Sequence, residues 1–143
     1  MSRALKMDID GLQEFLHKEF PQVAEDFIVE DLAPMAATIR LKPDVRHVRP
    51  GGTLSGPSMF ALADVGVYLA ILAMIGPEAL TVTTNASLDF MRKPAPDSDL
   101  IAKVRLLKLG RVLAVGDVLI FSGGQEDPVA RASLTYSIPP SRG

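Results

Sequence analysis

The chain has 143 residues, 48% of them hydrophobic and 22% charged, which is enough for one domain with a substantial core. Because it has no Cys and only two His, it can form no disulfide or thiolate nucleophile, and no His cluster for a metal. The net charge of −2, with basic residues scattered along the chain, argues against a nucleic-acid-binding protein.

The first predicted element is a short amphipathic helix over residues 8–18, capped by Asp8 or Asp10 and ended by Pro21. Its apolar stripe consists of Ile9, Leu12, Phe15 and Leu16. We expect residues 1–22 to form this helix and its lead-in to the rest of the domain. The N-terminal residues lack the apolar core of a signal peptide, so we expect a cytoplasmic protein.

Residues 27–43 alternate between apolar and polar side chains, which predicts a strand with one face toward solvent. The alternation is clearest where Ala37, Ile39 and Leu41 interleave with Thr38, Arg40 and Lys42.

Residues 49–75 hold the central feature of the sequence. A Gly-rich loop leads into a helix predicted to begin at Pro57, and this helix is apolar or small on every face. A helix without a polar face must be buried on all sides. Its length would suit a bilayer, but Asp64 near its centre and the amphipathic strands around it favour the core of a domain over a membrane span.

Asp64 is the one charge in this helix. An isolated carboxylate removed from water is costly, so it either bonds to a neighbouring element or has a chemical use. The loop favours chemistry, because Gly51, Gly52 and Gly56 allow close approach of a ligand to free N–H groups at the positive end of the helix. A carboxylate and an oxyanion site on one element are the parts of an acyl-transfer or hydrolysis centre.

The spacing of these groups predicts a dimer. Gly56 and Asp64 are eight residues apart, which is roughly 12 Å along a helix axis. A reacting carbonyl needs both groups within about 3 Å. We therefore predict that two chains pair so that Gly56 of one faces Asp64 of the other, giving two equivalent sites.

Residues 80–91 alternate over a long predicted strand, one face of which is rich in hydroxyl and amide side chains. This face consists of Thr81, Thr83, Asn85, Ser87, Asp89 and Met91. It is either an ordinary solvated face or the lining of the dimer seam and the site. In the second case Thr83 or Asn85 could hold a water molecule or the Asp64 carboxylate.

Three more alternating runs follow, at residues 100–109, 111–121 and 129–138, with a tight hairpin at Gly110 between the first two. Four successive strands after the helix predict an antiparallel meander. The predicted architecture is α+β: residues 1–143 form one domain in which a curled antiparallel sheet of five to six strands wraps a central hydrophobic helix. Exposed sheet edges suggest pairing with a second sheet.

In this order, the motifs resemble those of hotdog-fold acyl-CoA thioesterases of the phenylacetate-pathway (PaaI-like) type. The resemblance covers nearly the whole chain and is clearest over residues 41–138. Its specific parts are G-G-T-L-S-G (51–56), L-A-D (62–64), L-D-F-M-R-K-P (88–94) and K-L-G-R (108–111).

The resemblance implies a hotdog fold that hydrolyses an acyl-CoA or acyl-carrier thioester to a free acid and a thiol. Coenzyme A is then part of the substrate, and no cofactor is expected. The resemblance also implies Asp64 as general base or nucleophile, the Gly56 N–H of the opposite subunit as oxyanion donor, and Thr83 as the residue that positions water. The family has His before the key glycine, where this chain has Ser55, and commonly Asn where it has Arg49.

Further residues are candidates for contact with the substrate. An acyl pocket could be lined by Met59, Phe60, Tyr68 and Met91, for which a plain core role is the alternative. The phosphates of coenzyme A could be bound by Arg92, Lys93, Lys108 and Arg111, which are otherwise solvated surface charges. The remaining candidates for the substrate site are Arg49, Gly52 and Asn85.

The sequence therefore leaves two functional hypotheses. The first is a thioesterase that acts as a homodimer or a dimer of dimers, with Ser55 helping Gly56 to stabilise the oxyanion. The second is a protein of the same fold that binds an acyl thioester without hydrolysing it, which Ser55 and Arg49 favour. A hydratase would need an Asp and His pair on the helix, and no His follows His47.

Overall fold

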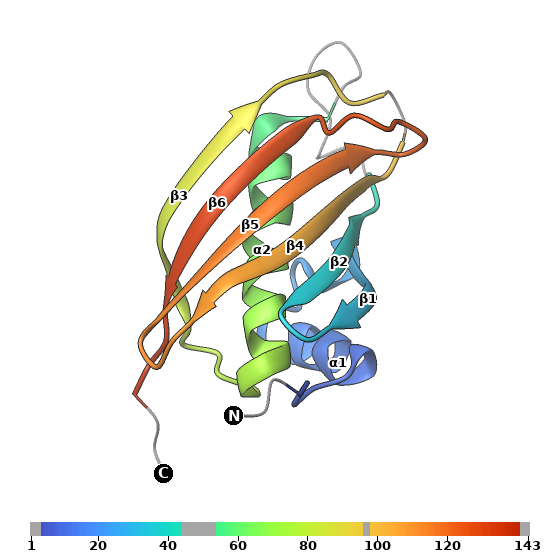
Figure 1. The fold of residues 1–143 in the computed structure, drawn as a ribbon. Helices are drawn as coiled ribbons and strands as arrows, with labels where there is room; N and C mark the ends of the chain where they lie inside the picture. The colour runs from blue at the N-terminus through green and yellow to red at the C-terminus, as the bar shows by residue number, and fades with distance from the viewer. Residues whose placement is uncertain (1–3, 44–53, 96–97, 141–143) are drawn as a thin grey trace.

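The computed structural model describes residues 4–43, 54–95 and 98–140 (Figure 1). A six-stranded antiparallel sheet in the order β1-β2-β4-β5-β6-β3 curls around one long helix. The elements are α1 (Ile9–Glu19), a 3-10 turn (Ala24–Asp26), β1 (Phe27–Ala33), β2 (Ala36–Leu41), α2 (Gly56–Ile75), β3 (Val82–Phe90), β4 (Leu100–Leu109), β5 (Leu113–Ser122) and β6 (Ala130–Ser137). The predicted α+β architecture is confirmed.

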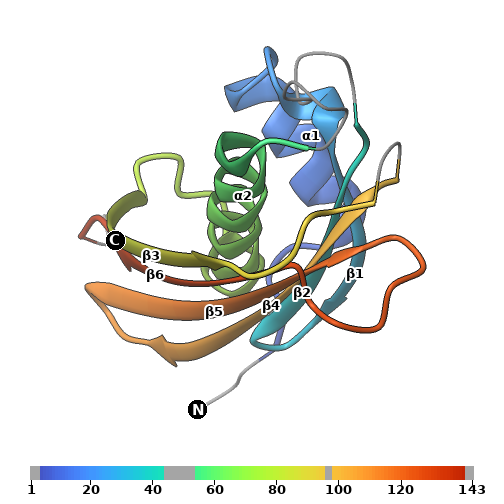
Figure 2. The same cartoon turned by 90° about the horizontal axis from the view of Figure 1, so that it is seen from above.

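The central helix α2 forms because its start is well capped and its side chains all favour burial. Ser55 is the N-cap, and its hydroxyl accepts a hydrogen bond from the Ser58 N–H at 3.2 Å. Gly76, with φ of 98°, ends the helix. By length and composition α2 could cross a membrane, but most of it is buried within the fold, where the sheet curls around it (Figure 2).

The short helix α1 lies beside β1 and contributes Leu12 and Leu16 to the core. Asp8 caps it by accepting a hydrogen bond from the Gly11 N–H at 2.7 Å, as one of the two predicted caps. The Gln13 side chain accepts a further hydrogen bond from the Val29 N–H at 2.6 Å, which ties α1 to the sheet.

Two predictions about the strands were wrong. Residues 27–43 form a hairpin of two strands, because the chain turns at Met35, whose φ of 66° is left-handed. The four strands after α2 do not form one meander. β4, β5 and β6 do, but β3 pairs with β6, and β2 lies beside β4. Alternation along a strand predicts its faces but not its neighbours, so β3 was wrongly assumed to pair with the next strand along the chain.

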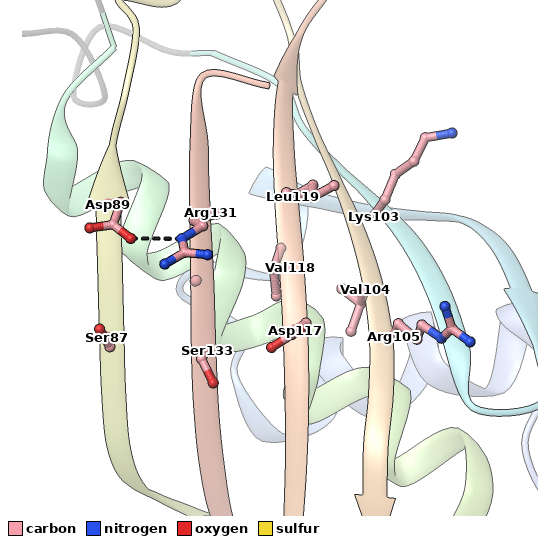
Figure 3. A pocket seen from close by; sticks show the side chains of 11 residues that line it. Ser87, Asp89, Lys103, Val104, Arg105, Asp117, Val118, Leu119, Arg131 and Ser133 are labelled. Carbon is pink, nitrogen blue, oxygen red and sulfur yellow. Dashed lines mark hydrogen bonds and ion pairs between the residues drawn. The ribbon is translucent and has the colours of Figure 1, made fainter. Parts of the chain in front are cut away.

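A β-bulge in β3 divides the hydroxyl-rich face. The register with β6 shifts between Thr83 and Asn85, so the inward- and outward-facing positions of β3 swap at Thr84. Thr83 lies opposite Tyr136 and faces α2, whereas Asn85 lies opposite Thr135 on the outer face of the sheet. The outer face also carries Ser87 and Asp89 (Figure 3).

Candidate active site

Asp64 is half-buried and is held by two hydroxyl groups. The Thr83 hydroxyl donates to its Oδ1 at 2.6 Å, and the Tyr136 hydroxyl lies 2.6 Å from the same atom. The Tyr136 hydroxyl is also 2.7 Å from the backbone carbonyl oxygen of Asp64. Among the described residues, all hydrogen bonds to the carboxylate go to Oδ1, so the second oxygen, Oδ2, keeps its lone pairs for a water molecule or a substrate.

Three elements build this cluster. Asp64 comes from α2, and Thr83 and Tyr136 are opposite each other on the neighbouring strands β3 and β6. Burial raises the pKa of the Tyr136 hydroxyl, and the negative charge of Asp64 raises it further. Tyr136 therefore remains protonated and serves as a hydrogen-bond donor.

The sequence reasoning identified Asp64 and Thr83 but missed Tyr136. A signal was present, because the last predicted strand carries Tyr136 on its apolar face. The other residues of that face are Ala130, Ala132, Leu134 and Ile138. A buried phenol needs a hydrogen-bond partner for its hydroxyl, so a tyrosine on a core face indicates a polar group within the core.

The start of α2 lies some distance from this cluster. Gly56 is the first helical residue, and its N–H has no acceptor within the helix. A Cβ added at Gly56 would lie 3.4 Å from the Phe90 ring, at the far end of β3 from Thr83. The Ser55 hydroxyl bonds to both the N–H and the hydroxyl of Ser58, the latter at 2.9 Å, so it serves the helix start.

A cavity of about 360 Å³ opens beside the start of α2. It brings together Gly56, Met59, Met91, Arg92 and Lys93 from the predicted site. Its lining is Leu54, Gly56, Met59, Phe90, Met91, Arg92, Lys93 and Pro94, which combines apolar walls with two cations. Such a lining suits an acyl thioester with an anionic carrier, although the Arg92 guanidinium also donates to the Pro128 carbonyl at 2.7 Å.

Other predicted site residues lie elsewhere. Lys108 is near the end of β4, and Arg111 lies in the β4–β5 turn, at the opposite end of the sheet from Arg92 (Figure 1). Phe60 is 39% exposed on α2, and Asn85 faces outward. The predictions for Arg49, Gly51 and Gly52 lie outside the described residues.

Tyr68 belongs to an aromatic group in the core. Its ring centroid lies 5.7 Å from that of Phe20 and 6.2 Å from that of Tyr136, and its hydroxyl donates to the Ala79 carbonyl at 3.2 Å. Burial raises the pKa of Tyr68 to about 12, helped by the nearby charge of Glu19. These contacts fit the core role that the sequence left open for Tyr68.

A second cavity, of about 460 Å³, lies on the outer face of the sheet (Figure 3). The ion pair between Arg131 and Asp89, at 2.7 Å, crosses it from β6 to β3. It is lined by Ser87 and Asp89 from the hydroxyl-rich face of β3, but by none of the candidate catalytic or substrate-binding residues. The larger hollow therefore does not contain the Asp64 cluster, and we take this cluster and the cavity at Gly56 as the candidate site.

Comparison with known proteins identifies the family. Residues 51–129 match the model of the thioesterase superfamily. The chain belongs to this superfamily. The predicted thioesterase family and hotdog fold are thereby confirmed, and the family indicates a hydrolase that acts on a thioester. The finer assignment to the PaaI-like type remains a prediction.

Individual relatives agree with this assignment. The chain is 31% identical over 113 residues to a Pseudomonas aeruginosa protein named "putative esterase PA0474", covering 79% of this chain and 83% of that one. The crystal structure of a "putative thioesterase" from Silicibacter sp. TM1040 is 60% identical, with a TM-score of 0.91 over 96% of each chain. A mutant of the phenylacetic acid degradation protein PaaI from Thermus thermophilus is 26% identical, with a TM-score of 0.71, covering 83% of this chain and 99% of that one.

Proposed function

We propose that this protein hydrolyses acyl-CoA-type thioesters to a free acid and a thiol, with Asp64 as general base and the Gly56 N–H as oxyanion donor across a dimer interface. The observation that carries the proposal is the Asp64 cluster. Two hydroxyls hold Oδ1 of a half-buried carboxylate and leave Oδ2 without a hydrogen bond from the described residues. These two hydroxyls orient the Asp64 carboxylate and leave Oδ2 able to act as a general base.

The hydrogen bonds of Thr83 favour a water molecule as the nucleophile. Its hydroxyl donates its only proton to Asp64, so toward a water it can only accept. A water between Thr83 Oγ1 and Asp64 Oδ2 would donate one proton to each and direct a lone pair outward. Attack on the thioester carbon transfers a proton to Asp64, and the oxyanion forms at the Gly56 N–H. The C–S bond then breaks, and the thiolate takes the proton back.

The exposed edge of β3 supports the pairing of two chains. β3 pairs with β6 on one side, and no other described strand pairs with it. The apolar residues at its two ends are Leu80, Val82, Phe90 and Met91, which are 44% to 69% exposed. A nine-residue edge strand with exposed apolar side chains is a template for a second strand. We expect two β3 strands to pair antiparallel about a two-fold axis.

This pairing would complete the site. If the axis passes near Ala86, the midpoint of β3, then Thr83 of one chain lies within one residue of the level of Phe90 of the other. Thr83 contacts Asp64. Phe90 lies beside Gly56. The carboxylate of one subunit and the oxyanion donor of the other therefore come to the same part of the seam, as the helix spacing requires.

The same pairing would gather the cations. Arg92 follows β3 at one end of the sheet, and Lys108 and Arg111 lie at the other end (Figure 1). Antiparallel strands reverse one sheet relative to the other, so Arg92 of one subunit comes to the same end as Lys108 and Arg111 of its partner. These side chains are our candidates for the phosphates of coenzyme A.

The test is hydrolysis of a panel of acyl-CoAs by the parent and by Asp64→Asn. We expect the substitution to lower kcat by about 10²- to 10⁴-fold, as loss of a general base does. Asp117→Asn is the matched control, because it makes the same change at an exposed carboxylate on β5, away from the β3 edge. An Asp64→Asn variant as fast as the parent would refute the assignment, and tight binding without hydrolysis by the parent would select the binding-protein alternative.

A further inference from the structure

We propose that Tyr136 is a positioning residue for the hydrolysis, which holds Asp64 in the orientation that presents Oδ2 to the water. This inference rests on the proposed function. Nothing in the family match or the sequence motifs assigns a role to the last strand, which lies beyond residues 51–129.

The contacts of Tyr136 reach two atoms of the same residue. Its hydroxyl is 2.7 Å from the backbone carbonyl oxygen of Asp64 and 2.6 Å from Oδ1. The hydroxyl has one proton, which these two acceptors share, so a single donor bridges the main chain and the side chain of Asp64 and restricts the rotation of the carboxylate about its side-chain bonds. A hydroxyl that only needed a partner for burial would be satisfied by the backbone carbonyl alone.

The place of Tyr136 in the sheet makes it the more rigidly held of the two hydrogen-bond donors to Asp64. β6 lies between β5 and β3 and is paired on both sides, and Tyr136 itself is only 2% exposed. Thr83, which shares Oδ1, comes from the edge strand β3. Tyr136 therefore fixes Asp64 to the rigid interior of its own subunit, whatever β3 does when a second chain pairs with it.

The variant Tyr136→Phe removes the hydroxyl and keeps the ring that contacts Tyr68. We expect kcat to fall about 10- to 100-fold, the usual loss for a hydrogen bond to a charged group. KM should change less than about threefold, because Tyr136 is 2% exposed and its hydroxyl contacts Asp64. The matched control is Ser122→Ala. Ser122 is 1% exposed and its hydroxyl bonds to Ala95 and Ser98, so this variant also loses a buried hydroxyl but should keep its kcat.

A double-mutant cycle separates positioning from structural support. If Tyr136 acts through Asp64, then adding Tyr136→Phe to Asp64→Asn lowers the residual rate by less than about twofold. An equal loss in both backgrounds would overturn the inference, and so would a Tyr136→Phe variant that keeps the parent's kcat. Thermal unfolding by circular dichroism, run on all four proteins, sets an assay temperature at which each is folded.

The two proposals fail differently in these measurements. If Asp64→Asn hydrolyses acyl-CoAs as fast as the parent, the proposed function fails. If Asp64→Asn is inactive but Tyr136→Phe is as active as the parent, only the positioning role fails.

Discussion

Mixing two inactive variants tests whether each site is shared between subunits. Asp64→Asn removes the base. Gly56→Pro removes the oxyanion donor without breaking an intrahelical hydrogen bond, because the first N–H of a helix has no intrahelical partner and proline suits this position. It also adds a ring toward Phe90, for which Gly56→Ala is the control. Ser55, with φ of −80° and ψ of 155°, already has the extended conformation that a following proline requires. We therefore expect Gly56→Pro to keep the helix and lose activity.

The expected magnitudes follow from the geometry. Loss of one oxyanion donor costs about 10²- to 10³-fold in kcat, and loss of Asp64 costs at least as much. In a mixed dimer, one site combines Asp64 of the Gly56→Pro chain with Gly56 of the Asp64→Asn chain, and the other site has neither group. Random assortment of equal amounts makes about half of the dimers mixed, so about one quarter of the parental activity should return.

The assay is hydrolysis of one acyl-CoA by each variant alone and by the mixture after subunits exchange under mild denaturant. Gly56→Ala is the control for added volume, because its Cβ would lie 3.4 Å from the Phe90 ring while its N–H remains. A mixture no more active than the sum of its parts, with exchange verified by differently tagged chains, would refute the shared site. Full activity in a verified monomer would refute it as well.

Three further predictions concern stability and assembly. Unfolded tyrosines ionise near pH 10, but the fold raises the pKa of Tyr68 to about 12 and also raises the pKa of Tyr136, so above pH 10 the unfolded state loses its tyrosine protons first. In urea titrations the free energy of unfolding should therefore fall by about 1.4 kcal/mol per tyrosine for each pH unit above pH 10. Tyrosinate absorbance should appear only when the protein unfolds. Gly66→Ala places a Cβ 2.9 Å from Val104 Cγ2 and should destabilise by about 1–2 kcal/mol in urea, because overpacking outweighs the gain in helix propensity. Ala86→Lys sets like charges opposite each other near the proposed axis, and light scattering should show monomers; an unchanged dimer would exclude this seam.

Much of the fold could be predicted from local pattern. The absence of any polar face on residues 57–75 predicts a buried helix, and the structure has it as α2. Alternation predicts the faces of β4, β5 and β6, which form the predicted hairpins. A lone carboxylate in an apolar helix identifies Asp64 as the residue to explain. These inferences hold because burial depends on the period of side chains along one element.

The tertiary structure decided what no single element contains. The partners of Asp64 are 19 and 72 residues away along the chain, and they meet only because β3 crosses to the far side of β6. The bulge in β3 turns Thr83 inward and Asn85 outward, although strict alternation would put both on one face. The period of apolar side chains along a helix or strand depends on neighbouring residues, whereas strand order and bulges depend on how the whole sheet closes around the helix. For this reason the sequence identifies Asp64 but not Tyr136, the residue that holds it.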